Sequence, residues 1–195
     1  MNIPAVLIGG LPESSLTSVH ANDRSASREA VKHFIDLGHR EIACVLNAPA
    51  CYNDAQTRLA GYKDALEEAG LPYHERLVRF ADFDPESGQV AMESLLKSEK
   101  FTAAFIASDN VAMGANRAIR EAGLHIPDDI SMVGFDDTPW SEYSDPPLTT
   151  VCIPAHDLAS KACLLLLDLL KGEIPEKRAL VLDTELVIRQ SCQKL

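Results

Sequence analysis

The chain has 195 residues, 46% apolar and 24% charged, which is the balance of a globular protein long enough to bury a core. Its formal net charge is −11, whereas proteins that bind nucleic acid usually present a basic face, so this chain alone is not expected to bind DNA. Its longest apolar run, Ala162 to Leu167, is far shorter than the ~20 residues of a membrane-spanning helix.

In the first half of the chain, short apolar runs alternate with amphipathic segments. They predict, in order, strands at Ala5–Ile8 and Ser18–Ala21 around a Gly-Gly-Leu-Pro turn, a helix at Ser25–Leu37, a strand at Ile42–Leu46, a helix at Asn53–Ala69 and a strand at Leu77–Phe80. Gly38 and Gly70 stand where the two helices should end. Asn53 and Gln56 have the spacing of a capping box.

The second half continues the alternation. It predicts a helix from an N-cap at Asp84 and a first-turn Pro85 to about Lys97, a strand at Ala103–Ala107, a helix from about Asp109 to Ala122, a strand at Ile130–Phe135 with no helix after it, a helix at Ala155–Leu170, and strands at Arg178–Leu182 and Leu186–Arg189. The Ala155–Leu170 helix is apolar on more than one face and is expected to be well buried. The alternation predicts an α/β fold with a parallel, helix-covered sheet.

The cysteine pattern and the N-terminal residues indicate the cellular compartment of the protein. The five cysteines (Cys44, Cys51, Cys152, Cys163 and Cys192) are odd in number, widely spaced and without a C-x-x-C pair, which favours reduced thiols over disulfides or a zinc site. No basic leader precedes the apolar residues near the N-terminus. We therefore expect a cytoplasmic protein with no membrane segment.

The run Pro127–Asp137 is the most informative stretch of the sequence. It contains a turn, a buried strand and two carboxylates, Asp136 and Asp137, at the carboxyl end of that strand. In open α/β sheets, ligands bind at this end of the strands. A loop stiffened by Pro146 and Pro147 then leads into a second extended segment.

Four motifs follow one another in order along nearly the whole chain. They are HFIDLGHREI at His33–Ile42, RLAGY at Arg58–Tyr62, ASDNVAMG at Ala107–Gly114, and the Pro127–Asp137 run closed by PPLTTV at Pro146–Val151. Together they resemble the effector-binding domain of the LacI/GalR family of transcriptional regulators. Each motif alone is weak, but their joint order and register make chance agreement improbable.

The resemblance implies a periplasmic-binding-protein-like fold of type I, in which two parallel-sheet lobes share crossovers and bind a small molecule between them. It assigns residues 1–22 and 154–183 to the N-terminal lobe, and residues 23–153 and 184–195 to the C-terminal lobe. The family's helix-turn-helix headpiece and the early repeats of its first lobe are not found here. The first lobe is thus expected to be incomplete, and DNA to be contacted only through a headpiece absent from this chain.

Asp136 is the first candidate for effector contact, because the family uses this position and a carboxylate accepts charge-assisted hydrogen bonds from hydroxyls. A turn-capping Asp is the alternative, and Asp137 is expected to serve the turn itself. Arg58 lies early enough in its helix to face the cleft, and its five donors suit hydroxyls or a carboxylate. The alternative for Arg58 is a surface ion pair.

Phe83, Tyr52 and Asp54 fall at positions that the family uses for its ligand. Phe83 lies where the family places an aromatic platform for a sugar or base ring, and the alternative is plain core packing. Tyr52 and Asp54 occupy a loop and the first turn of a helix at positions that vary with the effector. A solvated loop is their alternative.

Ser108 lies at a strand end just before a helix N-terminus, where free N–H groups favour polar ligands. Ser108 or Asp109 could instead cap that helix, and capping is the preferred interpretation for Asp109. Asn22, at a crossing between the lobes, is a weaker ligand candidate.

Trp140 and Tyr143 lie in a segment, Thr138 to Ser144, that is expected to be an exposed loop, where large aromatic residues suggest a partner surface. In the family this region and the helix containing Met113 contribute to a homodimer. Ordinary packing of the two aromatic residues onto the same lobe is the alternative.

Enzyme motifs are missing: the sequence contains no G-x-S-x-G, H-E-x-x-H or P-loop, and its six histidines lack metal-ligand spacing. Adjacent Asp136 and Asp137 diverge along the chain, unlike the facing carboxylates of a glycosidase. We expect no catalytic residues, no metal and no cofactor. The sequence predicts the effector-sensing and dimerisation domain of a LacI-type transcriptional regulator with a sugar-like effector. The alternatives are a solute-binding protein of a sugar transporter and, more weakly, a small sugar hydrolase.

Overall fold

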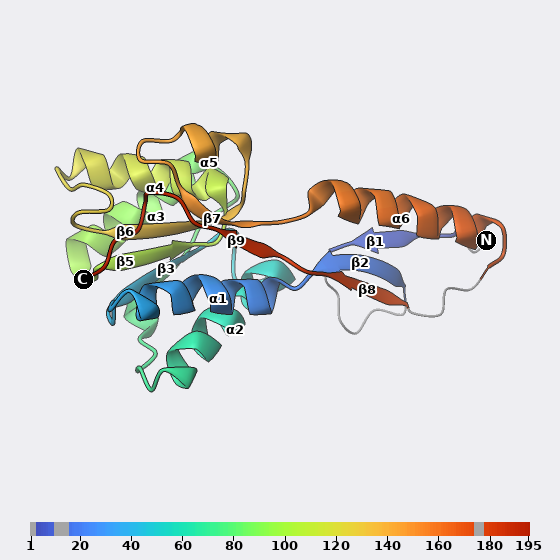
Figure 1. Ribbon diagram of the computed structural model, residues 1–195, viewed down its shortest axis with the longest axis horizontal. Helices are drawn as coiled ribbons and strands as arrows, with labels where there is room; N and C mark the ends of the chain where they lie inside the picture. The colour runs from blue at the N-terminus through green and yellow to red at the C-terminus, as the bar shows by residue number, and fades with distance from the viewer. Residues whose placement is uncertain (1–2, 10–15, 174–177) are drawn as a thin grey trace. The chain divides into compact units, whose positions relative to one another are not determined.

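A computed structural model describes residues 3–9, 16–173 and 178–195 of the chain, which divides into two compact units. The small unit comprises Met1–Asn22 and Ile153–Thr184, and the large unit comprises Asp23–Cys152 and Glu185–Leu195. Figure 1 shows the elements of both units along the chain. The Gly-Gly-Leu-Pro turn predicted after the first strand lies mostly outside the described residues, which resume at Leu16.

The large unit contains a six-stranded sheet with the order β4-β3-β5-β6-β7-β9. Its strands are β3 (Ile42–Leu46), β4 (Val78–Phe80), β5 (Ala103–Ile106), β6 (Ser131–Asp136), β7 (Thr149–Cys152) and β9 (Glu185–Val187). All pairings are parallel except that of β9, which runs antiparallel to β7. Every residue of β3 and β5 is buried, as expected for strands covered on both faces. The predicted parallel, helix-covered sheet is confirmed.

Two pairs of helices cover this sheet, one pair on each face (Figure 1). The pairs are α1 (Asp23–Asp36) with α2 (Asn53–Glu68), and α3 (Pro85–Ser98) with α4 (Asp109–Glu121). A 3₁₀ turn, η1 (Glu75–Leu77), precedes β4. The four helices predicted for this region are all present within a few residues of their expected bounds.

Helix caps agree with the sequence at α3 but not at α2. Asp84 caps α3 as predicted, accepting a hydrogen bond of 2.7 Å from the Ser87 amide. The capping box predicted for α2 is wrong, because the N-cap position is Tyr52 rather than Asn53. The Gln56 amide instead donates to the carbonyl of Ala50 in the preceding loop, at 2.8 Å.

Helices α3 and α4 approach each other so closely that their packing requires glycine at Gly88 and at Gly114. A Cβ atom on Gly114 would lie 1.7 Å from the carbonyl oxygen of Pro85 and 2.7 Å from the amide nitrogen of Gln89. Backbone atoms cannot yield as a flexible side chain does, so a larger residue would force the helices apart. Gly114 therefore fixes how α4, which carries Met113, packs on α3.

A short helix, α5 (Pro139–Tyr143), follows β6, although the sequence predicted a loop there. Pro139 occupies its first turn, and one turn of helix is too short to leave a periodic apolar pattern in the sequence. Trp140 of α5 is half-buried and packs against the core cluster between the sheet and helices α3 and α4. Tyr143, at the end of α5, is exposed.

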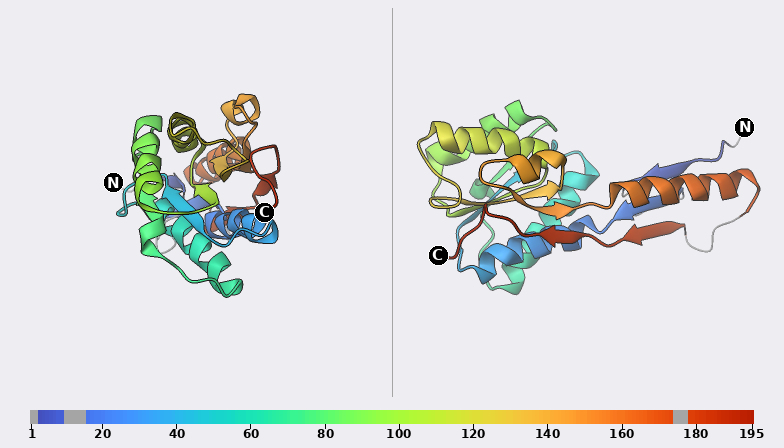
Figure 2. Two further views of the ribbon diagram at one scale, coloured as in Figure 1. Left: turned by 90° about the vertical axis from the view of Figure 1, so that its left-hand side faces the viewer. Right: turned by 45° about the horizontal axis from the view of Figure 1, so that its top comes forward.

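The small unit contains a three-stranded parallel sheet with the order β1-β2-β8. Its elements are β1 (Val6–Ile8), β2 (Thr17–Ala21), β8 (Ala179–Leu182) and α6 (Ala155–Leu170), which lies along β1 and β2 (Figure 2). The expectation that α6 is well buried is wrong. Leu158 and Ala162 are its buried residues, whereas Leu164, Leu167 and Leu170 are 52–62% exposed.

The reason is that the sheet of the small unit packs against the face of α6 that carries Leu158 and Ala162, whereas Leu164, Leu167 and Leu170 remain more than half exposed. Among the helices in the described part of the chain, none is both long and apolar enough to cross a membrane.

Candidate functional site

Asp136 is the last residue of β6 and stands at the carboxyl edge of the large sheet. Its backbone has φ of 116°, a conformation that residues with a side chain rarely adopt. Its side chain is 35% exposed. The carboxylate thus reaches the surface at the edge of the sheet where α/β proteins bind ligands.

Arg58, in the second turn of α2, is buried beside this carboxylate. Its Nε atom donates to Asp23 at 2.9 Å, and its Nη1 atom donates to the backbone carbonyl of Ala107. Its guanidinium carbon lies 3.9 Å from the ring centroid of Phe135, a stacking contact. These contacts hold the guanidinium in one position, and its Nη2 atom lies 3.9 Å from Oδ1 of Asp136, too far for a direct hydrogen bond.

The surroundings of Asp136 weaken its acidity. Burial raises the pKa of Asp136 to about 6; the charges of Asp109 and Asp23 act in the same direction, while Arg58 and a hydrogen bond with Ser108 oppose the shift. The group is therefore mainly a carboxylate at pH 7 and gains a proton as the pH falls through 6. A ligand that donates hydrogen bonds to it would bind more weakly below that pH.

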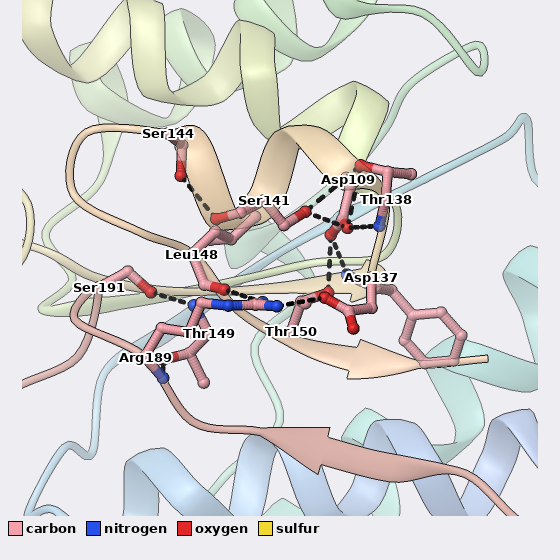
Figure 3. Close-up of polar contacts among 11 residues, drawn as sticks. Asp109, Asp137, Thr138, Ser141, Ser144, Leu148, Thr149, Thr150, Arg189 and Ser191 are labelled. Atoms are coloured by element: carbon pink, nitrogen blue, oxygen red, sulfur yellow. Dashed lines mark hydrogen bonds and ion pairs between the residues drawn. The ribbon is translucent and has the colours of Figure 1, made fainter. Parts of the chain in front are cut away.

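Ser108 and Asp109 begin α4 at the end of β5, next to Asp136 in the sheet. Ser108 occupies the N-cap position, but its side chain does not cap the helix. Asp109 is fully buried, and its carboxylate accepts hydrogen bonds from the Phe135 and Thr138 amides and from the hydroxyls of Thr138, Ser141 and Thr150. The preferred interpretation of Asp109 as a helix cap is therefore wrong, because its side chain turns to the β6–α5 segment instead (Figure 3).

Asp137 points to a different partner from Asp136. Its carboxylate accepts a hydrogen bond of 2.7 Å from Arg189, which also donates to the carbonyl of Leu148 (Figure 3). Asp137 thus links the turn after β6 to the segment that follows β9. The two adjacent carboxylates do not form the facing pair that a glycosidase requires.

Tyr52 and Phe83 form an aromatic pair elsewhere along the same edge. Their rings meet edge to face with centroids 5.1 Å apart, and about half of each side chain is exposed. The amide of Phe83 donates to the carbonyl of Asn47 at 2.8 Å, which holds the loop after β4 against the loop after β3. Asp54, in the first turn of α2, is exposed and within electrostatic reach of Arg58.

Asn22 lies in the other unit, at the end of β2, where its amide donates to the carbonyl of Leu182 at 3.2 Å. The structure thus brings Asp136, Arg58 and Ser108 together, and it places Tyr52 and Phe83 as a second cluster along the same sheet edge. Their contacts with an effector, and that of Asn22, remain predictions.

Sequence reasoning missed three contributors to the site: Asp23, Phe135 and the carbonyl of Ala107. Asp23 lies 35 residues before Arg58 in the chain, so no local spacing indicates that they pair. Phe135 has the pattern of an ordinary core residue, and its ring is indeed fully buried. The stacking of Arg58 on that ring had no sequence signal.

The three residues predicted to form a dimer surface line one hollow. Met113 on α4 and Trp140 and Tyr143 on α5 share it with Asn116 and Arg120, and its volume is about 580 Å³. Tyr143 is 81% exposed. Elsewhere, among the residues that the structure describes, no group of three or more His, Cys, Asp or Glu side chains gathers as a metal site would require.

Comparison with known proteins gives consistent matches. Residues 31–192 match the family model of a periplasmic-binding-protein-like domain. The chain is 37% identical to the HTH-type transcriptional regulator CelR of Thermobifida fusca, over 93% of this chain and 54% of that protein. A solved complex of CelR with cellobiose has a TM-score of 0.90 and 36% identity, over 95% of this chain and 58% of that one.

A LacI-family regulatory protein from Chloroflexus aggregans has a TM-score of 0.89 and 32% identity, over 97% of this chain and 68% of that one. The chain spans about half the length of the curated relatives that it matches.

Proposed function

Because the chain belongs to the LacI family of transcriptional regulators and its residues 31–192 match the periplasmic-binding-protein-like domain, we propose that it senses a small, hydroxyl-rich effector for such a regulator. Membership of this family confirms the resemblance seen in the sequence. We further propose that residues 1–22 and 154–183 belong to the N-terminal lobe, and residues 23–153 and 184–195 to the C-terminal lobe.

The pairing of Asp136 with Arg58 carries the proposal. The Asp136 carboxylate is one-third exposed and 3.9 Å from a guanidinium whose position Asp23 and Ala107 already fix. A hydroxyl group both donates and accepts hydrogen bonds, so one hydroxyl can donate to the carboxylate while a neighbouring one accepts from Nη2. Vicinal hydroxyls are the defining feature of sugars and of nucleoside riboses.

The exposed rings of Tyr52 and Phe83 support the same ligand class, since the apolar face of a sugar ring stacks on aromatic side chains. Ser108 adds a hydroxyl beside the carboxylate. The cellobiose complex of CelR is consistent with a carbohydrate, and for this chain we propose the class rather than the individual sugar.

The test is a thermal-shift and titration-calorimetry screen of the chain with ribose, glucose, cellobiose and cytidine. We expect at least one of them to stabilise the protein, by about 2.7 kcal/mol at a hundredfold excess over its dissociation constant. Asp136→Asn should abolish the shift. Asp128→Asn is the matched control, because Asp128 is an exposed aspartate beyond the opposite end of β6. Equal stabilisation of the wild type and Asp136→Asn would remove Asp136 from the site.

We also propose a homodimer through the hollow lined by Met113, Trp140 and Tyr143. An exposed tyrosine beside a half-buried tryptophan is typical of interface centres. Sedimentation velocity of Met113→Asp should show dissociation of the dimer. Val90→Asp, at an exposed apolar position on neighbouring α3, should leave the association state unchanged. If both variants sediment as the wild type does, the dimer contact lies elsewhere.

The relatives are transcriptional regulators, which favours this role over that of a transporter's solute-binding protein. In the whole protein we propose a cytoplasmic location and DNA contact through a helix-turn-helix segment outside these 195 residues. The divergence of Asp136 and Asp137 supports binding rather than hydrolysis of the sugar.

A further inference from the structure

Asp109 makes an unusual set of contacts for a residue at a helix start. Its side chain is fully buried, so it cannot touch a ligand at the surface. Oδ1 accepts from the Phe135 amide at 2.9 Å and from the Thr150 hydroxyl at 2.7 Å, and Oδ2 accepts from the Thr138 amide at 2.8 Å and from the Ser141 hydroxyl. Burial nevertheless raises the pKa of Asp109, and these donors oppose that shift.

The two amides bracket the effector carboxylate. Phe135 immediately precedes Asp136, and Thr138 immediately follows Asp137. The Asp109 carboxylate therefore accepts hydrogen bonds from the backbone on both sides of this pair. Between these two points the backbone takes positive φ at Asp136 and again at Asp137. Such conformations persist only where surrounding contacts impose them.

The hydroxyls of Ser141 and Thr150 connect the Asp109 carboxylate to two further elements. Ser141 belongs to α5 and Thr150 to β7, so Asp109 joins the end of β6, α5 and β7 at a single point (Figure 3). Gly134 makes room for it, because a Cβ atom there would lie 2.3 Å from Oδ1 of Asp109. A glycine inside a buried strand is otherwise unfavourable, and here it serves this close approach.

We infer that Asp109 is the positioning residue of the effector site: its buried carboxylate sets the turn that presents Asp136 and ties that turn to α5 and β7. The inference rests on the proposed effector role of Asp136. Since α5 also carries Trp140 and Tyr143, the same carboxylate links the effector site to the proposed dimer surface through Ser141. A change in the conformation of the turn at Asp136 would therefore be transmitted to α5 through the hydrogen bond between Asp109 and Ser141.

The first test needs no effector. Asp109→Asn keeps the size of the side chain but replaces one acceptor with a donor and removes the charge. We expect the Phe135 and Thr138 amides to exchange with solvent roughly tenfold faster or more, while amides of β3 keep their wild-type rates. In a carboxyl NMR titration, the midpoint of Asp136 should fall below its wild-type value of about 6, because a neighbouring negative charge is lost and the turn loosens. The groups facing Asp136 are Arg58, Asp23, Ser108 and Asp109.

A second pair of variants keeps the inference testable if Asp109→Asn does not fold. Thr150→Val deletes one donor to Asp109 and preserves the shape of the side chain. Its control is Ser144→Ala, which deletes a buried hydroxyl that donates to the carbonyls of Ser141 and Pro146. Thr150→Val should speed exchange of the Phe135 amide several-fold, and Ser144→Ala should not.

A binding experiment uses whichever compound of the screen the wild type binds. The dissociation constant for that compound should rise at least tenfold in Asp109→Asn. If the wild type binds none of the four compounds, the proposed effector class fails while the exchange and titration results still judge Asp109. The inference is overturned if Asp136 titrates at its wild-type midpoint in Asp109→Asn. Exchange that rises equally in β3, or equal effects of Thr150→Val and Ser144→Ala, would overturn it as well.

Discussion

Replacing Arg58 with methionine should be one of the costliest single changes in the large unit. Arg58 is 8% exposed, and its Asp23 partner is also mostly covered, so the substitution leaves a buried carboxylate without its cation. Removing one member of a buried ion pair costs about 3–5 kcal/mol. The Asp136 contact adds little, since it is longer and its carboxylate is one-third exposed. We therefore expect a loss of about 3 kcal/mol, or roughly 10 °C in the melting temperature.

The assay is urea denaturation followed by circular dichroism, with Arg24→Met as the matched control. Arg24 also forms a two-contact ion pair, with Asp64, but its side chain is 61% exposed, and we expect no measurable change in stability. Arg58→Lys should fall between the wild type and Arg58→Met, because lysine keeps the charge but not the planar stacking on Phe135. Equal urea midpoints for Arg58→Met and Arg24→Met would refute the view that the buried ion pair of Arg58 with Asp23 stabilises the large unit.

Three further predictions follow from the structure. Affinity for the effector should fall about tenfold from pH 7 to pH 5, because the ionised fraction of Asp136 falls by that factor around its pKa of about 6. Titration calorimetry at both pH values measures this change, and equal affinities would contradict the prediction. Gly114→Ala should cost about 3 kcal/mol in urea denaturation, because its Cβ atom would meet the Pro85 carbonyl; an unchanged midpoint would show that α3 and α4 can move apart freely. Leu167→Gln, on the exposed side of α6, should leave the melting temperature unchanged, whereas Leu158→Ala should lower the free energy of unfolding by about 2 kcal/mol. Similar losses for both variants would contradict the burial of Leu158 and the exposure of Leu167.

Most of the fold could be predicted from local patterns, because the sheet of the large unit is built from short buried runs between amphipathic helices. The cap at Asp84 and the stop at Gly70 are local features that depend on neighbouring residues alone. The capping box at Asn53 failed because the loop before α2 supplies its own carbonyl at Ala50. The burial of α6 failed because apolar composition does not indicate which faces a neighbouring element covers.

The site was predictable where a residue stands at a strand end, and unpredictable where a partner comes from far along the chain. Asp136 and Ser108 follow buried strands, so topology alone brings them to one edge. Asp109 was misread as a cap because its donors belong to four residues that lie 26 to 41 positions away in the chain. Gly134 carried a usable signal, since a glycine in a buried strand indicates close approach by another group.

Backbone strain gives an independent argument for this edge of the sheet. Within the described chain, the non-glycine residues with positive φ are Phe83, Asp136 and Asp137, and all three stand at the carboxyl edge of the large sheet. Holding a residue with a side chain in such a conformation costs about 1–3 kcal/mol, and a glycine at the same position would avoid this cost. At Asp137 the ion pair with Arg189 is a structural contribution that offsets this strain. The side chains of Asp136 and Phe83 are partly exposed, and we propose that contact with a ligand is the contribution that offsets the strain there.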